Sequence, residues 1–325
     1  MCAVYAICYP PPMHAYRNIG WLIILALLWS VTFGMVKVAL EIPPMTMTAI
    51  RLAIAAAVVV VYLYARGERL STPSSTWFYF GAIALFALVI PFNALVYAES
   101  RISSGLASIP VAAGPLLTVL MGHIATKDEK ISPAKLVGVG LGLAGLLLLL
   151  GPPEIAGVGG DAIGLGAMLG GVVSYVFSNM LTRRLRGVSV AAIGAHVMIA
   201  GAVISFILSF IVEQPLSINP SWEAMGAVVV LAVLSTAAAY MVLFHLVTSV
   251  GVTFASLTNY MIPPLAVLWG ILFLDESFVW PMLLAMGLIF SGVWITNQSL
   301  VRERHRLTQQ AQDATATTAD DAPPA

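Results

Sequence analysis

The stretch LLWSVTF at residues 27–33 lies in an apolar run, and a related stretch, VVSYVF, lies in another apolar run at residues 172–177. Ser30 of the first aligns with Ser174 of the second at a shift of 144 residues, and a phenylalanine follows three positions later in both. This agreement predicts an internal repeat. The repeat decides the fold, because every other apolar segment then belongs to one half or the other.

Further residues align between the two halves at shifts of 147 and 148 residues, and the small drift in the shift indicates short insertions in loops. The matched pairs are Ala107 with Ala255, Ser108 with Ser256, Pro115 with Pro263, Asp128 with Asp275, Glu129 with Glu276, Gly140 with Gly287 and Gly145 with Gly292. We therefore expect one repeat over residues 19–152 and a second over residues 160–298.

The composition identifies a membrane protein. Hydrophobic residues make up 60% of the chain and charged residues 9%, whereas a soluble domain carries roughly 25% charged residues. The mean hydropathy is +0.95. A helix needs about 20 mostly apolar residues to cross the hydrocarbon core of a bilayer. That criterion predicts spans at 19–40, 44–65, 77–98, 104–126, 133–151, 161–182, 188–212, 222–247, 252–274 and 278–297.

Each predicted repeat holds five spans, and because five is odd, the two repeats must lie upside down relative to each other. Inverted repeats recur in secondary transporters, where they expose a central site to either side in turn. The predicted fold class is therefore an all-α membrane protein of ten transmembrane helices, built as two inverted five-helix repeats.

The basic residues orient this topology, because cytoplasmic loops are enriched in Lys and Arg. With a cytoplasmic N-terminus, 12 of the 15 basic residues fall in cytoplasmic segments, and the predicted outer loops are acidic. We expect residues 1–18 to be a cytoplasmic N-terminus and residues 299–325 a disordered cytoplasmic tail. The expected location is the bacterial-type inner membrane. The acidic outer residues are Glu41, Glu99, Glu154, Asp161, Glu213, Glu223, Asp275 and Glu276.

Four sequence features together resemble the EamA-like branch of the drug/metabolite transporter superfamily. They are LLWSVTF in the first span, the second span that starts at Pro44 and contains Arg51, the run GLASIPVAAGPLL from residue 105, and FASLTNYMIPPLAVLWGILFLDE from residue 254. The resemblance implies a central cavity lined by helices one to four and six to nine, with helices five and ten at the periphery. One departure is Trp29-Ser30, where many relatives have Trp-Gly.

Arg51 is the main candidate for substrate binding. It lies about seven residues into the second span, and a cation near the bilayer centre costs at least ~2.5 kcal/mol unless it faces a wet cavity or a partner. One interpretation is a bidentate contact with a carboxylate or phosphate of the substrate. The other is a structural tie to helix-end carbonyls or to Glu41 or Glu99. Lys37 and Glu41, one turn apart, are expected to be interfacial.

Three histidine and tyrosine positions have repeat-related interpretations. Arg51 aligns with Ala195, next to His196, so His196 is a candidate to approach the same site and to titrate in the physiological range; a packed, hydrogen-bonded histidine is the alternative. His245 and Tyr97 align with each other near opposite helix ends and suit gating layers.

The other polar residues in apolar sequence are candidates to bind substrate or to join helices, because an amide within hydrocarbon must find a partner. These candidates are Asn93 with Tyr97, Asn179, and Asn259 with Tyr260. Glycines of the fifth and tenth spans predict tight helix contact, either within one chain or in a homodimer.

Missing motifs narrow the function. The chain has no phosphate-binding loop and no H-E-x-x-H metal site, so we expect no cofactor, metal or catalytic residue. We expect a carrier that moves a small polar metabolite, amino-acid-like or an organic acid, by alternating access, with efflux as its direction. A lipid or lipid-linked-sugar flippase is the alternative, and an intramembrane enzyme is the remote one. The expected partners are a small-molecule substrate and membrane lipid, with no nucleic acid.

Overall fold

The described part of the protein is helical, with no strand among its residues. The computed structural model describes residues 12–68, 76–114, 133–150, 162–182, 188–249, 258–277 and 280–292, together with 70, 72, 117, 121, 185, 255, 294 and 295. Residues 1–11 of the predicted N-terminal segment 1–18, and the whole predicted tail 299–325, lie outside the described residues.

The first predicted repeat contains helices whose starts follow the expected signals. Pro44 occupies the first turn of α3, where a missing N–H costs nothing, and Ser103 caps α6 by accepting a hydrogen bond from the Leu106 N–H. The elements are α2 (Pro12–Val38), α3 (Pro44–Ala65), α4 (Trp77–Ala84), η2 (Leu85–Val89), α5 (Ile90–Glu99), α6 (Ser104–Ala112) and α8 (Pro133–Leu150).

The second predicted repeat contains the corresponding helices. Ser189 and Ser221 cap α11 and α12 through the N–H groups of Ala192 and Ala224. The elements are α10 (Ala162–Thr182), α11 (Val190–Val212), η3 (Pro215–Ser217), α12 (Trp222–Ala232), η4 (Val233–Ala238), α13 (Ala239–Ser249), α15 (Thr258–Phe273) and a further helix, Trp280–Gly292.

Two π-helical segments occupy matching places in the two repeats. Leu85–Val89 interrupts the α4–α5 helix, and Val233–Ala238, which starts 148 residues later, interrupts the α12–α13 helix. In the first repeat Pro91 accounts for the change of winding, because proline cannot continue the α-helical hydrogen bonds. The shift of 148 residues equals that between Ala107 and Ala255, so the backbone conformation repeats at the same spacing as the sequence.

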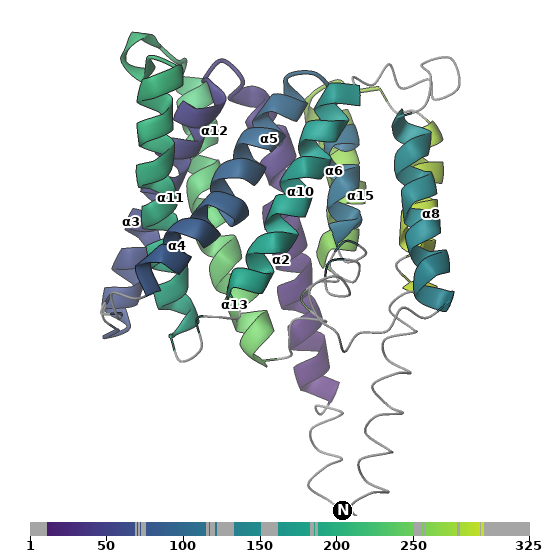
Figure 1. Ribbon diagram of the computed structural model, residues 1–325, viewed down its shortest axis with the longest axis horizontal. Helices are drawn as coiled ribbons and strands as arrows, with labels where there is room; N and C mark the ends of the chain where they lie inside the picture. Colours follow the sequence, from purple (N-terminus) through teal and green to yellow (C-terminus); the bar gives the residue numbers. More distant parts are fainter. Residues whose placement is uncertain are drawn as a thin grey trace, which may run out of the picture.

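Corresponding helices of the two repeats run antiparallel. The first turn of α3 touches the last turns of α11, where the Thr46 and Ser209 hydroxyls lie 2.6 Å apart. These two helices pack side by side along much of their length (Figure 1). Antiparallel packing of equivalent helices is the arrangement that an inverted repeat predicts.

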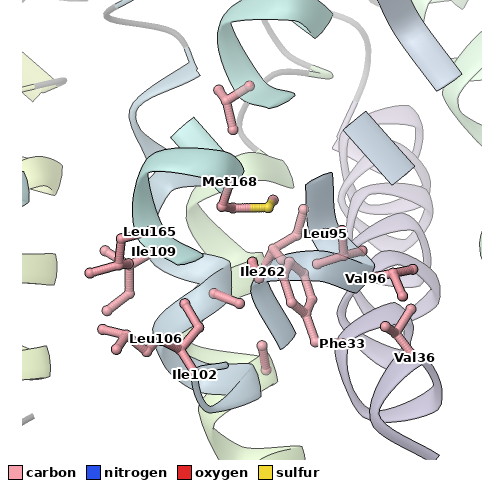
Figure 2. Close-up of a cluster of buried hydrophobic side chains, with 14 of the residues drawn as sticks. Phe33, Val36, Leu95, Val96, Ile102, Leu106, Ile109, Leu165, Met168 and Ile262 are labelled. Carbon is pink, nitrogen blue, oxygen red and sulfur yellow. The ribbon is translucent and has the colours of Figure 1, made fainter. Parts of the chain in front are cut away.

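The largest buried cluster joins the two repeats. Figure 2 shows Phe33 and Val36 of α2, Leu95 of α5 and Ile109 of α6 gathered with Ile262 of α15. α15 packs against both α2 and α6. The first and fourth helical segments of one repeat are therefore held by a helix of the other.

Three carboxylates connect the two repeats at one end of the bundle, which we name the Glu213 face. This face holds the loops between α2 and α3, between α5 and α6 and between α11 and α12, at the top of Figure 1. Glu213 accepts hydrogen bonds from the N–H groups of Met45 and Thr46 at 2.8 and 2.7 Å. Glu276 accepts bonds from the start of α6, and Glu41 accepts one from the start of α12. Carboxylates suit helix N-termini, where unpaired N–H groups and the helix dipole favour negative charge.

α8 lies at the edge of the bundle beside the helix Trp280–Gly292 (Figure 1). A Cβ atom on Gly145 would lie 2.8 Å from the main-chain oxygen of Ala285, and one on Gly292 would overlap the oxygen of Gly138. These glycines therefore let the two helices approach closely within one chain, as the predicted small-residue faces require.

Five described helical segments are long and apolar enough to cross a membrane: Arg17–Val38, Pro44–Ala65, Trp77–Glu99, Ala191–Val212 and Trp222–Leu243. Shorter apolar helices cover Ala162–Ser178, Thr258–Phe273 and Trp280–Gly292. The chain is thus an integral membrane protein. The count of ten spans stays a prediction, because most of residues 115–132 and 250–257 lie outside the described residues.

Candidate functional site

Arg51 lies in the interior of the bundle, between helices of both repeats. It is 2% exposed, its Nε donates to the Thr236 hydroxyl at 2.8 Å, and its guanidinium carbon lies 3.8 Å from the centre of the Phe92 ring. Phe92 follows the π-helical segment η2, and Thr236 lies within η4. Arg51 therefore connects the two π-helical regions.

Further aromatic side chains lie near Arg51. Tyr240 is close enough to act electrostatically on Arg51, and its ring meets Trp29 edge to face at a centroid distance of 6.3 Å. Tyr240 lies 148 residues after Phe92, so the repeat places an aromatic ring from each half beside Arg51. A cation next to aromatic faces gains about 0.5–2 kcal/mol per contact, more when water is excluded.

No carboxylate among the described residues pairs with Arg51. Its hydrogen bond to Thr236 uses Nε, and the described part of the chain offers no hydrogen bond to the two terminal nitrogens. A buried charge without a counter-charge is costly, and a guanidinium can bind a carboxylate or phosphate through two parallel N–H bonds. The site is thus suited to an anionic group.

Side chains satisfy carbonyl groups near the π-helical segments. The Asn93 amide donates to the Val89 oxygen at 2.7 Å, Ser174 donates to the Phe86 oxygen at 2.8 Å, and Thr236 donates to the Leu231 oxygen at 2.8 Å. π-helical turns are frequent at functional sites. Asn93 thus has a structural bond, while its side-chain oxygen is buried without a partner among the described residues.

His196 is packed and lies at a different depth from Arg51. Its ring stacks on Phe80 at 4.6 Å, Nδ1 lies 2.7 Å from the Ala192 oxygen, and Nε2 lies 3.3 Å from the Thr72 hydroxyl. Measured from the Thr46–Ser209 contact at ~1.5 Å per residue, Arg51 lies about 8 Å along α3 and His196 about 20 Å along α11. These contacts favour a packed histidine over a shared site with Arg51.

Tyr97 and His245 lie apart from Arg51 and from each other. Tyr97 is exposed near the end of α5, where the Arg101 guanidinium lies 4.8 Å from its ring. The ring of His245, near the end of α13, meets Trp21 edge to face at 5.5 Å. Their places near helix ends agree with gating layers, which remain a prediction.

The remaining candidates, Asn179, Asn259 and Tyr260, lie on helices of the second repeat. The Asn259 amide approaches Gly114 of the fourth predicted span, where a Cβ atom would lie 3.8 Å from it. The Tyr260 ring meets Phe290 at 6.0 Å, on the last helix. Asn179 lies in α10, but its side chain falls outside the described residues. These contacts fit helix packing, and no described contact joins them to Arg51.

Lys37, rather than Arg51, makes the hydrogen bonds to main-chain carbonyls at a helix end that the sequence analysis considered for Arg51. Its ammonium donates to the main-chain oxygens of Glu99 and Ile102 at 2.6 and 2.9 Å. The Glu99 oxygen lies at the C-terminal end of α5, where a cation is favourable, and the Ile102 oxygen lies in the loop that follows. Lys37 is therefore a structural residue of the Glu213 face.

Sequence reasoning missed three residues, Phe92, Thr236 and Tyr240, and it did not predict that Glu99, named among the outer acids, is buried. Phe92 and Tyr240 could have been found, since they align at the shift of 148 residues and lie one position from Asn93 and four from Thr236. Thr236 resembles any threonine in an apolar helix, and only its 2.8 Å contact with Arg51 gives it a role.

Comparison with known proteins bears on the family and the fold. The EamA-like transporter family matches residues 17–151 and, a second time, residues 162–298. The chain is 25% identical to the uncharacterized transporter YoaV of Bacillus subtilis, over 87% of this chain and 97% of that one. It is 28% identical to the uncharacterized inner membrane transporter YedA of Escherichia coli, over 85% and 90%.

A third relative has a named substrate. The S-adenosylmethionine/S-adenosylhomocysteine transporter of Chlamydia trachomatis is 27% identical, over 88% of this chain and 90% of its own length. A crystal structure with 24% sequence identity shares the fold at a TM-score of 0.65, over 88% of this chain and 98% of that chain.

Proposed function

Because the chain belongs to the EamA-like transporter family, and is thus a membrane transporter, we propose that it carries small metabolites bearing a carboxylate or another anionic group, by alternating access around Arg51. The observation behind this proposal is a buried guanidinium, between helices of both repeats, with no acidic partner among the described residues. The substrate supplies the missing negative charge.

The aromatic rings beside Arg51 refine the substrate class. The rings of Phe92 and Tyr240 lie near Arg51 and give an apolar surrounding for the rest of the same molecule, while Arg51 holds the anionic end. Amino-acid-like molecules and organic acids fit this division. S-adenosylmethionine and S-adenosylhomocysteine, named for the relative from Chlamydia trachomatis, both carry an amino-acid carboxylate and belong in the first substrate panel.

The inverted repeats supply the mechanism. Exchange of conformation between two related halves opens a site between them to each side in turn, and Arg51 of the first repeat bonds Thr236 of the second. We place the protein in the inner membrane with both termini in the cytoplasm and the Glu213 face outside, with efflux as its direction. The basic residues of the predicted cytoplasmic loops support this orientation.

Flux of labelled substrates through proteoliposomes tests the proposal. Arg51→Ala removes a bidentate, charge-assisted contact worth about 1.5–3 kcal/mol, so transport of the anionic substrate should fall roughly 10- to 150-fold. Arg66→Ala is the matched control, because Arg66 ends the same helix and is exposed.

Two results would contradict the proposal. One is unchanged flux of every carboxylate-bearing compound in folded Arg51→Ala protein. The other is movement of labelled lipid without flux of any small metabolite, which would favour the flippase alternative.

A further inference from the structure

Glu99 is a buried carboxyl group that transport through Arg51 does not use. It is the last residue of α5 and is 0% exposed. Its Oε2 accepts a bond from the Ser104 hydroxyl at 3.3 Å, and its Oε1 is buried with no hydrogen-bond partner among the described residues. An ionised carboxylate in such a place lacks the donors that would replace water.

A second carboxylate shares the same partner. Glu276 accepts hydrogen bonds from the N–H groups of Ser104 at 2.8 Å and Gly105 at 3.4 Å. Because these N–H groups start α6, the helix dipole favours a negative charge on Glu276. Two carboxyl groups held by one serine repel each other when both are ionised, and the group with fewer donors keeps a proton. That group is Glu99.

The charged groups around Glu99 do not remove the need for this proton. The ammonium of Lys37, from α2, donates its hydrogen bonds to the main-chain oxygens of Glu99 and Ile102 rather than to the carboxyl group of Glu99. Arg51, from α3, bonds Thr236 and lies beside Phe92, about two turns from Glu99. Among the other elements packed against α5, the described ranges of η2, α6 and α10 contain no Asp, Glu, Lys, Arg or His.

We propose that Glu99 is a proton-binding site, occupied in the arrangement seen here, and that its proton leaves to water when the Glu213 face opens. Glu276 of the second repeat holds the start of α6 of the first repeat, so separation of the halves must break these bonds and hydrate Glu99. The closed face binds one proton more than the open face. High external pH therefore favours opening, and low external pH favours closure.

This inference rests on the proposed function only in that a carrier opens the Glu213 face to the outside. It adds the proton as an ion whose binding is coupled to that opening. Its test uses neither substrate nor Arg51, so it can fail while the carrier assignment stands, and the reverse also holds.

Labelling of a reporter cysteine with a membrane-impermeant maleimide, in intact bacterial cells, measures opening. Ser108→Cys, in a background with Cys2→Ser and Cys8→Ser, places the thiol one turn inside α6, where Ser108 is 0% exposed and its hydroxyl donates to the Gly105 oxygen of its own turn. Ser217→Cys, at an exposed position of the loop between α11 and α12, corrects for the pH dependence of the thiol reaction.

The proposal expects the ratio of the two labelling rates to rise at least fivefold between external pH 5.5 and 8.5, an order-of-magnitude expectation for release of one proton. Glu99→Gln, which keeps the shape of the protonated group, should hold the ratio low and flat. A flat ratio in the parent, or an undiminished rise in Glu99→Gln, overturns the proposal. If Glu99→Gln does not fold, Glu99→Asp should move the midpoint of the rise, and an unchanged midpoint overturns it.

Discussion

Removal of the Glu213 carboxylate should destabilise the bundle by an amount that its contacts allow us to predict. The carboxylate accepts bonds from the Met45 and Thr46 N–H groups and from the Thr46 hydroxyl at 2.9 Å. In Glu213→Ala the hydroxyl keeps its contact with Ser209, so the loss is that of a helix cap, about 1–2 kcal/mol, plus the charge–dipole term, about 0.3–1 kcal/mol.

A total of about 2 kcal/mol corresponds to a fall in Tm of roughly 4–8 °C, with the lower end expected for a chain of this size. The assay is thermal unfolding of the purified protein in detergent. Glu223→Ala is the matched control, because Glu223 is an exposed acid in the first turn of α12 and no contact among the described residues joins its carboxylate to α3. Equal melting temperatures for the two variants would refute the idea that Glu213 clamps the repeats together.

Two further predictions concern the same bundle. Hydrogen bonds from the Ser221 side chain and backbone lower the pKa of Glu41 below its ordinary value of 4.5. Glu41 therefore contributes stability above pH 4.5 that is lost as pH falls through the lowered pKa. The melting temperature of Glu41→Gln should depend less on pH in this acid range than that of the unaltered protein, and equal slopes of melting temperature against pH would contradict the prediction. Gly145→Val places a Cβ atom 2.8 Å from the Ala285 oxygen and should cost about 1–3 kcal/mol, whereas Gly140→Val, with nothing within 4 Å, should lower the Tm by clearly less.

The sequence predicted the helices well where local signals were strong. Pro44 and the basic residue after Ala65 bounded the second span, and α3 has the predicted limits. The repeat was readable because side chains at its centre, such as Ser30 and Ser174, are constrained by close packing. The π-helical segments were not predicted, since Pro91 marks only the first of them and nothing in the second repeat breaks the helical pattern.

The candidate site was readable only in part. Arg51 stood out because a cation in a span is costly, but its partners come from 41 and 185 residues further along the chain, at Phe92 and Thr236. Glu99 looked like an interfacial acid at the end of a span. It is buried instead, and the Ser104 N–H that lies next to it in the fold binds Glu276, a residue 172 positions away from Ser104 that local sequence does not place there.

Counterflow in proteoliposomes tests the central claim most directly. Vesicles loaded with an unlabelled carboxylate substrate should transiently accumulate the labelled form, because unlabelled molecules inside compete with the labelled ones for the single alternating site and delay their return. The account predicts this overshoot for the unaltered protein and for Arg66→Ala, and its loss in Arg51→Ala. An overshoot of equal size in Arg51→Ala, or flux with no overshoot in any of the three proteins, would contradict it.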